Sequence, residues 1–171
     1  MNKSLSVKNL VLVSVIAAIY FVPVFLFSDI SFGNVQFRIS EFLTVLPLFT
    51  FWAIPGLTLG CFLFNLIGFF LGRTVIIDLL FGTLATFIAT IICYFLVRKI
   101  KSKILKCLVC PIPVILCNGI IVGYEITKFL VGGNFFINMA LVALGECVVC
   151  YVLGLPLELA LFKNDLYKKI F

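Results

Sequence analysis

The stretch Phe42–Gly72, FLTVLPLFTFWAIPGLTLGCFLFNLIGFFLG, contains 31 consecutive residues without a charged side chain. As a single α-helix it would be about 46 Å long, which exceeds the hydrocarbon core of a bilayer at about 30 Å. The pair Pro55-Gly56 lies near its middle, and Pro-Gly is a turn signal. The sequence therefore predicts two short helices here, at residues 40–54 and 56–72.

The composition points to a membrane protein. Of 171 residues, 64% are hydrophobic and 12% are charged, whereas a soluble domain is about 45–50% apolar and about 25% charged. The chain has no His, which excludes imidazole catalysis and His-ligated zinc. The net charge of +6 suggests a nucleic acid or a membrane surface as partner. The apolar composition decides for the membrane.

Charge-free intervals outside the opening stretch mark the other spans, because a spanning helix needs about 20 apolar residues. Glu146 alone interrupts the last interval, so it is taken as one helix. The first apolar run lacks a small-x-small cleavage pattern, so it is taken as a retained helix rather than a signal peptide. The predicted fold is one all-α transmembrane domain, residues 1–171, with six helices at about 7–27, 40–54, 56–72, 76–97, 108–131 and 136–162.

Basic residues set the predicted orientation, since they concentrate in cytoplasmic loops. With six spans and both termini cytoplasmic, ten bases lie inside and three outside. Treating residues 42–72 as one span would place the basic run Arg98–Lys106 outside. This run is therefore interpreted as a topology determinant, not a nucleic-acid site.

Polar side chains at membrane depth are costly and indicate function. On this topology Glu41 and Asp78 begin helices near the outer face, and Asn65, Asn118 and Glu146 lie deeper. The first helix contributes none. The pattern predicts an outward-facing polar cavity walled by the second to sixth helices.

Three of the acidic residues also have a structural explanation. Glu41 and Asp78 lie in first turns, where the helix dipole favours a carboxylate. Glu125 is one turn from a base, as in an ordinary i,i+3 pair. The corresponding bases are Arg38, Arg73 and Lys128. Structure and function remain equal alternatives for each of the three.

The remaining polar residues divide differently. Asn65 and Asn118 could hold helices together by hydrogen bonds. Glu146 has no base within a turn, so a functional role is favoured. Glu158 lies near the cytoplasmic end and is expected to pair with Lys163.

The predicted cavity favours a particular ligand chemistry. Carboxylates accept hydrogen bonds, while Asn both donates and accepts. A matching ligand carries adjacent N–H donors, as on a guanine-like edge, or a positive charge. Six Phe residues near the outer ends could stack on a flat ring: Phe32, Phe37, Phe69, Phe70, Phe135 and Phe136. The seven cysteines, including Cys107-x-x-Cys110 and Cys147-x-x-Cys150, are expected to pack in the core, and no metal is expected.

Several motifs follow one another at corresponding helix positions. They are Arg38-Ile-Ser-Glu41 with Leu46-Pro47, Gly56-Leu-Thr-Leu-Gly60 leading to Asn65, Asp78-Leu-Leu-Phe-Gly82-Thr-Leu-Ala-Thr86, Pro111-x-Pro113 leading to Asn118 and Gly123, and Gly145-Glu146 leading to Gly154-Leu-Pro156. This order resembles the queuosine-precursor transporter (QueT) family, which supplies substrate-binding S components of energy-coupling-factor (ECF) transporters. The likeness extends from about Ser6 to Leu161.

The resemblance implies a non-enzymatic S component in a bacterial cell membrane, without a cofactor. Its partners would be a transmembrane coupling protein and two cytoplasmic ATPase subunits. Its substrate would be a 7-deazaguanine base with a cyano or aminomethyl group. The implied substrate-binding residues are Arg38, Glu41, Asn65, Asp78, Asn118 and Glu146.

The coupling protein would dock on the first helix. S components often carry Ala-x-x-x-Ala there, and the nearest match is Ser14-x-x-x-Ala18, with Ala17 beside it. Small residues four apart permit close helix approach.

Three other readings stay open. The chain could be an S component for another vitamin or nucleobase, which would change only the pocket. It could be a stand-alone channel or proton-coupled carrier, although no internal repeat of the usual carrier plan is found. An intramembrane enzyme is the least favoured, since no nucleophile and base cluster together.

Overall fold

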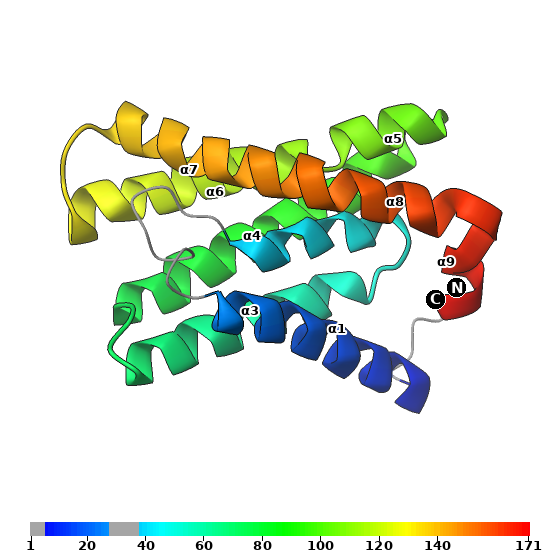
Figure 1. Cartoon of the computed structure of the whole chain (residues 1–171), viewed down its shortest axis with the longest axis horizontal. Helices are drawn as coiled ribbons and strands as arrows, with labels where there is room; N and C mark the ends of the chain where they lie inside the picture. The colour runs from blue at the N-terminus through cyan, green and yellow to red at the C-terminus, as the bar shows by residue number, and fades with distance from the viewer. Residues whose placement is uncertain (1–5, 28–37) are drawn as a thin grey trace.

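The computed structural model describes residues 6–27 and 38–171, and the regular structure within these ranges is helical (Figure 1). The long α-helices are α1 (Val7–Leu26), α3 (Ala53–Phe70) and α4 (Ile76–Arg98). Two longer segments are each built of three pieces: α5 (Lys103–Val109), α6 (Ile112–Glu125) and η2 (Ile126–Leu130), then α7 (Phe135–Val149), η3 (Cys150–Gly154) and α8 (Leu155–Phe162). The short elements are η1 (Ile39–Leu48), η4 (Lys163–Asp165) and α9 (Leu166–Ile170).

Five segments of the described chain are long and apolar enough to cross a membrane: Val7–Leu26, Ala53–Phe70, Ile76–Arg98, Lys103–Leu130 and Phe135–Phe162. They correspond to five of the six predicted helices. The predicted helix at 40–54 is instead the ten-residue 3-10 helix η1. At about 2.0 Å rise per residue it reaches only about 20 Å, short of the bilayer core.

The break within the long apolar stretch lies earlier than the sequence suggested. The chain turns at residues 49–52, between η1 and α3, and Pro55-Gly56 lies inside α3. Pro55 is the third residue of α3, where the backbone N–H has no intrahelical partner to lose. The pair therefore begins a helix instead of separating two.

Two glycines bring α3 against α1. A Cβ atom at Gly56 would lie 2.8 Å from Ile16 Cβ, and one at Gly60 would lie 2.8 Å from Tyr20 Cβ and 2.9 Å from the Ala17 carbonyl oxygen. Such spacing is the small-xxx-small pattern that lets membrane helices approach closely. Together with Leu57 and Phe64, this contact forms the main hydrophobic core.

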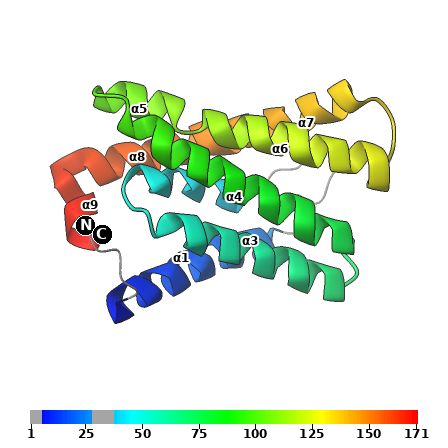
Figure 2. The same ribbon diagram turned by 180° about the vertical axis from the view of Figure 1, so that it is seen from behind.

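The long helices lie side by side along the longest axis of the molecule (Figure 1). The start of α1 and the C-terminal α9 lie at one end, and the turns after α3 and η2 lie at the opposite end. Seen from behind, α4 crosses between α3 and α6 (Figure 2). The short η1 packs inside this bundle, against α1, α3, α4, α7 and η3. Its polar side chains are therefore surrounded by helices.

The α1–α3 contact gives a first prediction. Replacing Gly60 by Ala improves intrinsic helix propensity, yet the added methyl must displace Tyr20 or the α1 backbone. Overpacking of this kind costs about 1–3 kcal/mol. We expect a lower midpoint of thermal unfolding for the purified variant in detergent.

The matched control is Leu59→Ala on the same helix, where Leu59 is 41% exposed. This change should leave the midpoint nearly unchanged. An unfolding midpoint for Gly60→Ala equal to that of the wild type would contradict close packing at this position.

Candidate binding site

The helix η1 places Glu41 in the interior of the bundle. Glu41 is fully buried, and its Oε1 accepts hydrogen bonds from the Tyr20 hydroxyl at 2.7 Å and from the Thr86 hydroxyl at 3.0 Å. Thr86 lies eight residues after Asp78 on α4, hence about 12 Å deeper. The prediction that Glu41 lies near the outer face is therefore wrong, because η1 begins within the bundle.

Ser40, the neighbour of Glu41, joins η1 to α1. Its hydroxyl donates to the Tyr20 carbonyl and accepts from the Val24 N–H, the latter at 3.2 Å. In an undisturbed α-helix these two backbone groups would bond directly to each other. The Ser40 side chain is thus inserted into the hydrogen-bond ladder of α1, next to Pro23.

Arg38 is the most unusual buried side chain. It is 1% exposed, and its three guanidinium nitrogens have no hydrogen-bond partner. It makes no hydrogen bond to Glu41, so the expected local pair is not formed. Gly82 gives it room, because a Cβ atom there would lie 2.9 Å from Arg38 Nη1 and 2.9 Å from Asn65 Nδ2. The Arg38 guanidinium and the Asn65 amide therefore meet over one glycine of α4.

Asn118 and Glu146 form the opposite wall, from α6 and α7. The Asn118 amide donates to Glu146 Oε1 at 3.0 Å, and both residues are fully buried. Glu146 lies near enough to Arg38 and Glu41 to interact electrostatically with each. The deep carboxylate that lacked a base in its own helix thus lies near Arg38, the residue that immediately precedes η1.

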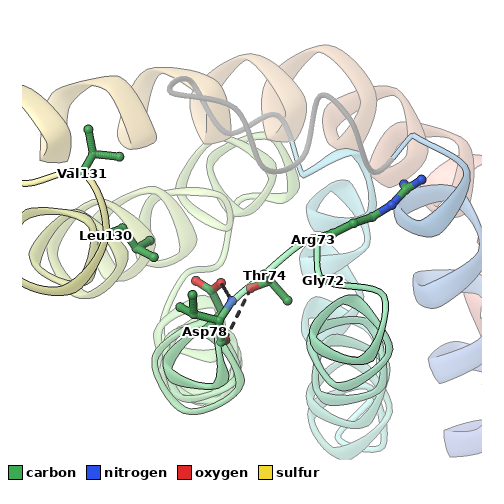
Figure 3. Close-up of a pocket in the computed structure, with 7 residues that line it drawn as sticks. Gly72, Arg73, Thr74, Asp78, Leu130 and Val131 are labelled. Carbon is green, nitrogen blue, oxygen red and sulfur yellow. Dashed lines mark hydrogen bonds between the residues drawn. The ribbon is translucent and has the colours of Figure 1, made fainter.

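Asp78 and Glu125 lie nearer the end of the bundle that carries the α3–α4 turn. Asp78 Oδ2 accepts the Val75 N–H at 3.0 Å, which caps α4, and it borders a cavity of about 240 Å³ (Figure 3). Glu125 interacts with Asp78. It is fully buried with both oxygens unpartnered, whereas Lys128 is exposed. The structural alternative for Glu125, an ion pair with Lys128, is therefore wrong.

The structure adds residues that the sequence reasoning missed. Tyr20 contributes from α1, so the prediction that the first helix contributes no polar group is wrong. Thr86 shares its face of α4 with Asp78 and Gly82, a spacing of four residues that could have signalled its role. Two buried thiols also border the cluster, with Cys61 accepting from Thr86 at 3.4 Å and Cys150 donating to the Glu41 carbonyl at 3.6 Å.

Other predicted residues lie outside the cluster. Glu158 is fully buried without a hydrogen-bond partner, so the expected pair with Lys163 is wrong. Ser14 and Ala18 are exposed on α1, while Ala17 is buried against α3 and not accessible for docking. Of the aromatic residues proposed for stacking, Phe32 and Phe37 lie outside the described residues. Of the remaining four, Phe69, Phe70 and Phe136 are exposed, with exposed fractions of 38%, 75% and 69%.

The unpartnered atoms define what the cluster can bind. Arg38 offers three donor nitrogens, and the unpartnered acceptors are Glu41 Oε2, Asn65 Oδ1, Asn118 Oδ1 and Glu146 Oε2. A buried polar atom without a partner costs about 1–3 kcal/mol, and native structures contain few of them. A buried set of donors and acceptors suits a flat polar ligand that has both N–H groups and a carbonyl oxygen.

The chain also matches a known protein family. A family model described as QueT transporter matches residues 10–163. The chain belongs to the QueT transporter family. The family predicted from the sequence motifs is thereby confirmed. Its matched region contains all the cluster residues, from Tyr20 to Glu146. Searches of curated proteins and of solved structures returned no match.

Membership in the QueT transporter family, with five apolar helices long enough to span, makes the chain a multi-pass membrane transport protein. A transporter of this family is not an enzyme. It binds a small-molecule substrate and lies in the lipid bilayer. The buried polar cluster holds side-chain atoms without a hydrogen-bond partner in the described chain.

The Tyr20–Glu41 hydrogen bond gives a second prediction. Tyr20→Phe removes the hydroxyl donor from a buried carboxyl group, and hydrogen bonds to charged groups contribute about 1.5–3 kcal/mol. We expect a clearly lower midpoint of thermal unfolding in detergent.

Tyr151→Phe is the control, since the Tyr151 hydroxyl donates at 2.8 Å to the Leu108 carbonyl nearer the surface. Its loss should cost less, about 0.5–1.5 kcal/mol. Equal midpoints for the two variants would show that Tyr20 does not hold Glu41 in place.

Proposed function

We propose that the chain is the substrate-specific S component of an ECF-type importer and captures a queuosine precursor, a 7-deazaguanine base with a cyano or aminomethyl group. The observation that carries this proposal is the buried Arg38 guanidinium, which has no hydrogen-bond partner and lies among carboxyl and amide groups that also have free atoms. Membership in the QueT transporter family supports the substrate class.

The hydrogen-bonding groups of a deazaguanine match this set. Its ring N–H and exocyclic amine are adjacent donors, which Glu41 or Glu146 accepts through the oxygen left unpartnered. Arg38 donates to the ring carbonyl oxygen. Asn65 and Asn118 complete the edge, since amides both donate and accept. A ligand that lacks either the donors or the carbonyl leaves buried groups unpaired and is discriminated against.

Transport itself requires partners. In the proposed assembly the chain hydrolyses nothing, and a transmembrane coupling protein with two cytoplasmic ATPase subunits drives substrate release. The S component has six helices, η1 being the short one, and both termini face the cytoplasm of a bacterial cell. The α1 start and α9 lie at the same end of the bundle, which supports this topology (Figure 1).

The third prediction tests ligand class. Isothermal calorimetry of the purified chain in detergent should detect tight binding of 7-cyano- or 7-aminomethyl-7-deazaguanine, and weak or no binding of guanine, folate and riboflavin. Glu146→Gln should abolish precursor binding, because Asn118 already donates to one carboxyl oxygen and the substitution turns the other acceptor oxygen into an amide donor. The unfolding midpoint of this variant should show that it stays folded.

The outcomes separate the alternatives. Wild-type affinity in Glu146→Gln would remove Glu146 from the site. Tight binding of riboflavin or folate with no precursor binding would keep the S-component reading and change the substrate. No binding across the panel would favour a stand-alone carrier.

The fourth prediction tests coupling through α1. Ser14 and Ala18 form an exposed small-residue pair on α1, suited to close approach of a partner helix. Ala18→Phe fills that surface. It should leave precursor binding intact and abolish ATP-driven uptake in proteoliposomes that contain the coupling module.

Ala140→Phe, at an exposed alanine of α7, is the matched control and should transport normally. Equal uptake by both variants would exclude docking at Ala18. Uptake by the chain alone, without ATPase subunits, would contradict the S-component proposal.

A further inference from the structure

Glu125 is a buried acid that the proposed hydrogen bonds to the base do not use. It is fully buried, and both carboxyl oxygens lack a hydrogen-bond partner. Its neighbour is Asp78, 4% exposed, which interacts with it across the α4–α6 contact. Two buried carboxyl groups thus interact with one another, and an unpaired buried charge is costly.

Arg38 interacts electrostatically with Glu125, yet the described chain buries fewer bases than acids. Arg38 is the only buried base there, while five acidic residues are buried: Glu41, Asp78, Glu125, Glu146 and Glu158. Arg38 also interacts electrostatically with Cys61, Tyr20, Glu41 and Glu146. The Asp78–Glu125 pair therefore shares the one buried positive charge of the described chain with other groups.

The two nearest bases in sequence point elsewhere. Arg73 is exposed, and its side chain is directed away from Asp78 (Figure 3). Lys128 is exposed one turn beyond Glu125. The pair is accordingly an acidic position that a cation from outside the chain can complement.

The distance between the Asp78–Glu125 pair and the Asn118–Glu146 pair fits a single substrate molecule. Asn118 and Glu125 are buried on the same face of α6, seven residues or about 10 Å apart. Asp78 and Thr86 are likewise buried on α4, eight residues or about 12 Å apart. A bicyclic base that is hydrogen-bonded at the Asn118–Glu146 level and carries a short arm extends toward the Asp78–Glu125 level. The cavity of about 240 Å³ beside Asp78 lies at that same end.

We propose that Asp78 and Glu125 form a subsite for the ammonium group of the substrate, so that the chain takes the cationic aminomethyl base in preference to the neutral cyano base. This inference rests on the proposed function and assigns the specificity within it. An ammonium group has three donors and no acceptor. It can donate hydrogen bonds to the unpartnered oxygens of Glu125, and its positive charge neutralises the negative charge of the buried carboxyl group.

The fifth prediction compares the two deazaguanines by calorimetry on the wild-type chain and on Glu125→Gln. The wild type should bind the aminomethyl base roughly 10- to 100-fold more tightly, the range of one hydrogen bond to a charged group. Glu125→Gln should lose most of that advantage, while its affinity for the cyano base changes less than about threefold.

Glu158→Gln is the matched control, because Glu158 is also fully buried with both oxygens unpartnered, yet lies on α8 near Cys107 and Cys110. It should leave both affinities unchanged. Equal wild-type affinities for the two bases, or an equal loss of both in Glu125→Gln, would overturn the subsite and leave the proposed function standing. Absence of binding for both bases would overturn the proposed function as well.

Discussion

The docking of η1 onto α1 is the contact on which the site depends. The Ser40 hydroxyl is inserted between the Tyr20 carbonyl and the Val24 N–H, and the Tyr20 hydroxyl donates to Glu41 at 2.7 Å. Two consecutive residues of η1 thus bond α1 through its backbone and through a side chain. This fixes η1 within the bundle and directs Arg38 and Glu41 toward α4 and α7.

The rest of the bundle is shaped around that inserted helix. Gly56 and Gly60 bring α3 close to α1, and Gly82 leaves space on α4 for Arg38 and Asn65. Each of these positions lacks a side chain because another group occupies the volume that a Cβ atom would need. Glycine therefore serves two purposes in this bundle. At Gly56 and Gly60 it permits close helix packing, and at Gly82 it leaves room for the Arg38 guanidinium.

Much of the fold could be predicted from the sequence, because a bilayer imposes a simple requirement on composition. Five of the predicted helices correspond to segments that are long and apolar enough to span a membrane. The polar positions Glu41, Asn65, Asn118 and Glu146 are all buried, and Asn118 bonds Glu146. The length and type of η1 could not be predicted, since an apolar run of this length is compatible with an α-helix, a 3-10 helix or a turn. The wrong depth predicted for Glu41 followed from treating η1 as a spanning helix that begins at the outer face.

The sequence also could not predict which acidic and basic side chains form pairs. Glu125 and Lys128, or Glu158 and Lys163, are close enough along the chain to form pairs, yet each glutamate is buried and each lysine is exposed. A helix directs residues three apart only roughly to one side, and packing decides which of them points inward. Arg38 and Glu41 likewise lie near one another without a hydrogen bond.

By itself the sequence determined that the chain lies in a membrane, where the five segments long enough to span it lie, which polar residues are costly to bury, and the family to which it belongs. These follow from composition, charge-free length and ordered motifs, all of which are local along the chain. Only the tertiary structure decided that Tyr20 and Thr86 hold Glu41, that Arg38 lies over Gly82, and that Asp78 interacts with Glu125. These contacts join residues on different helices, and their geometry depends on how the helices pack.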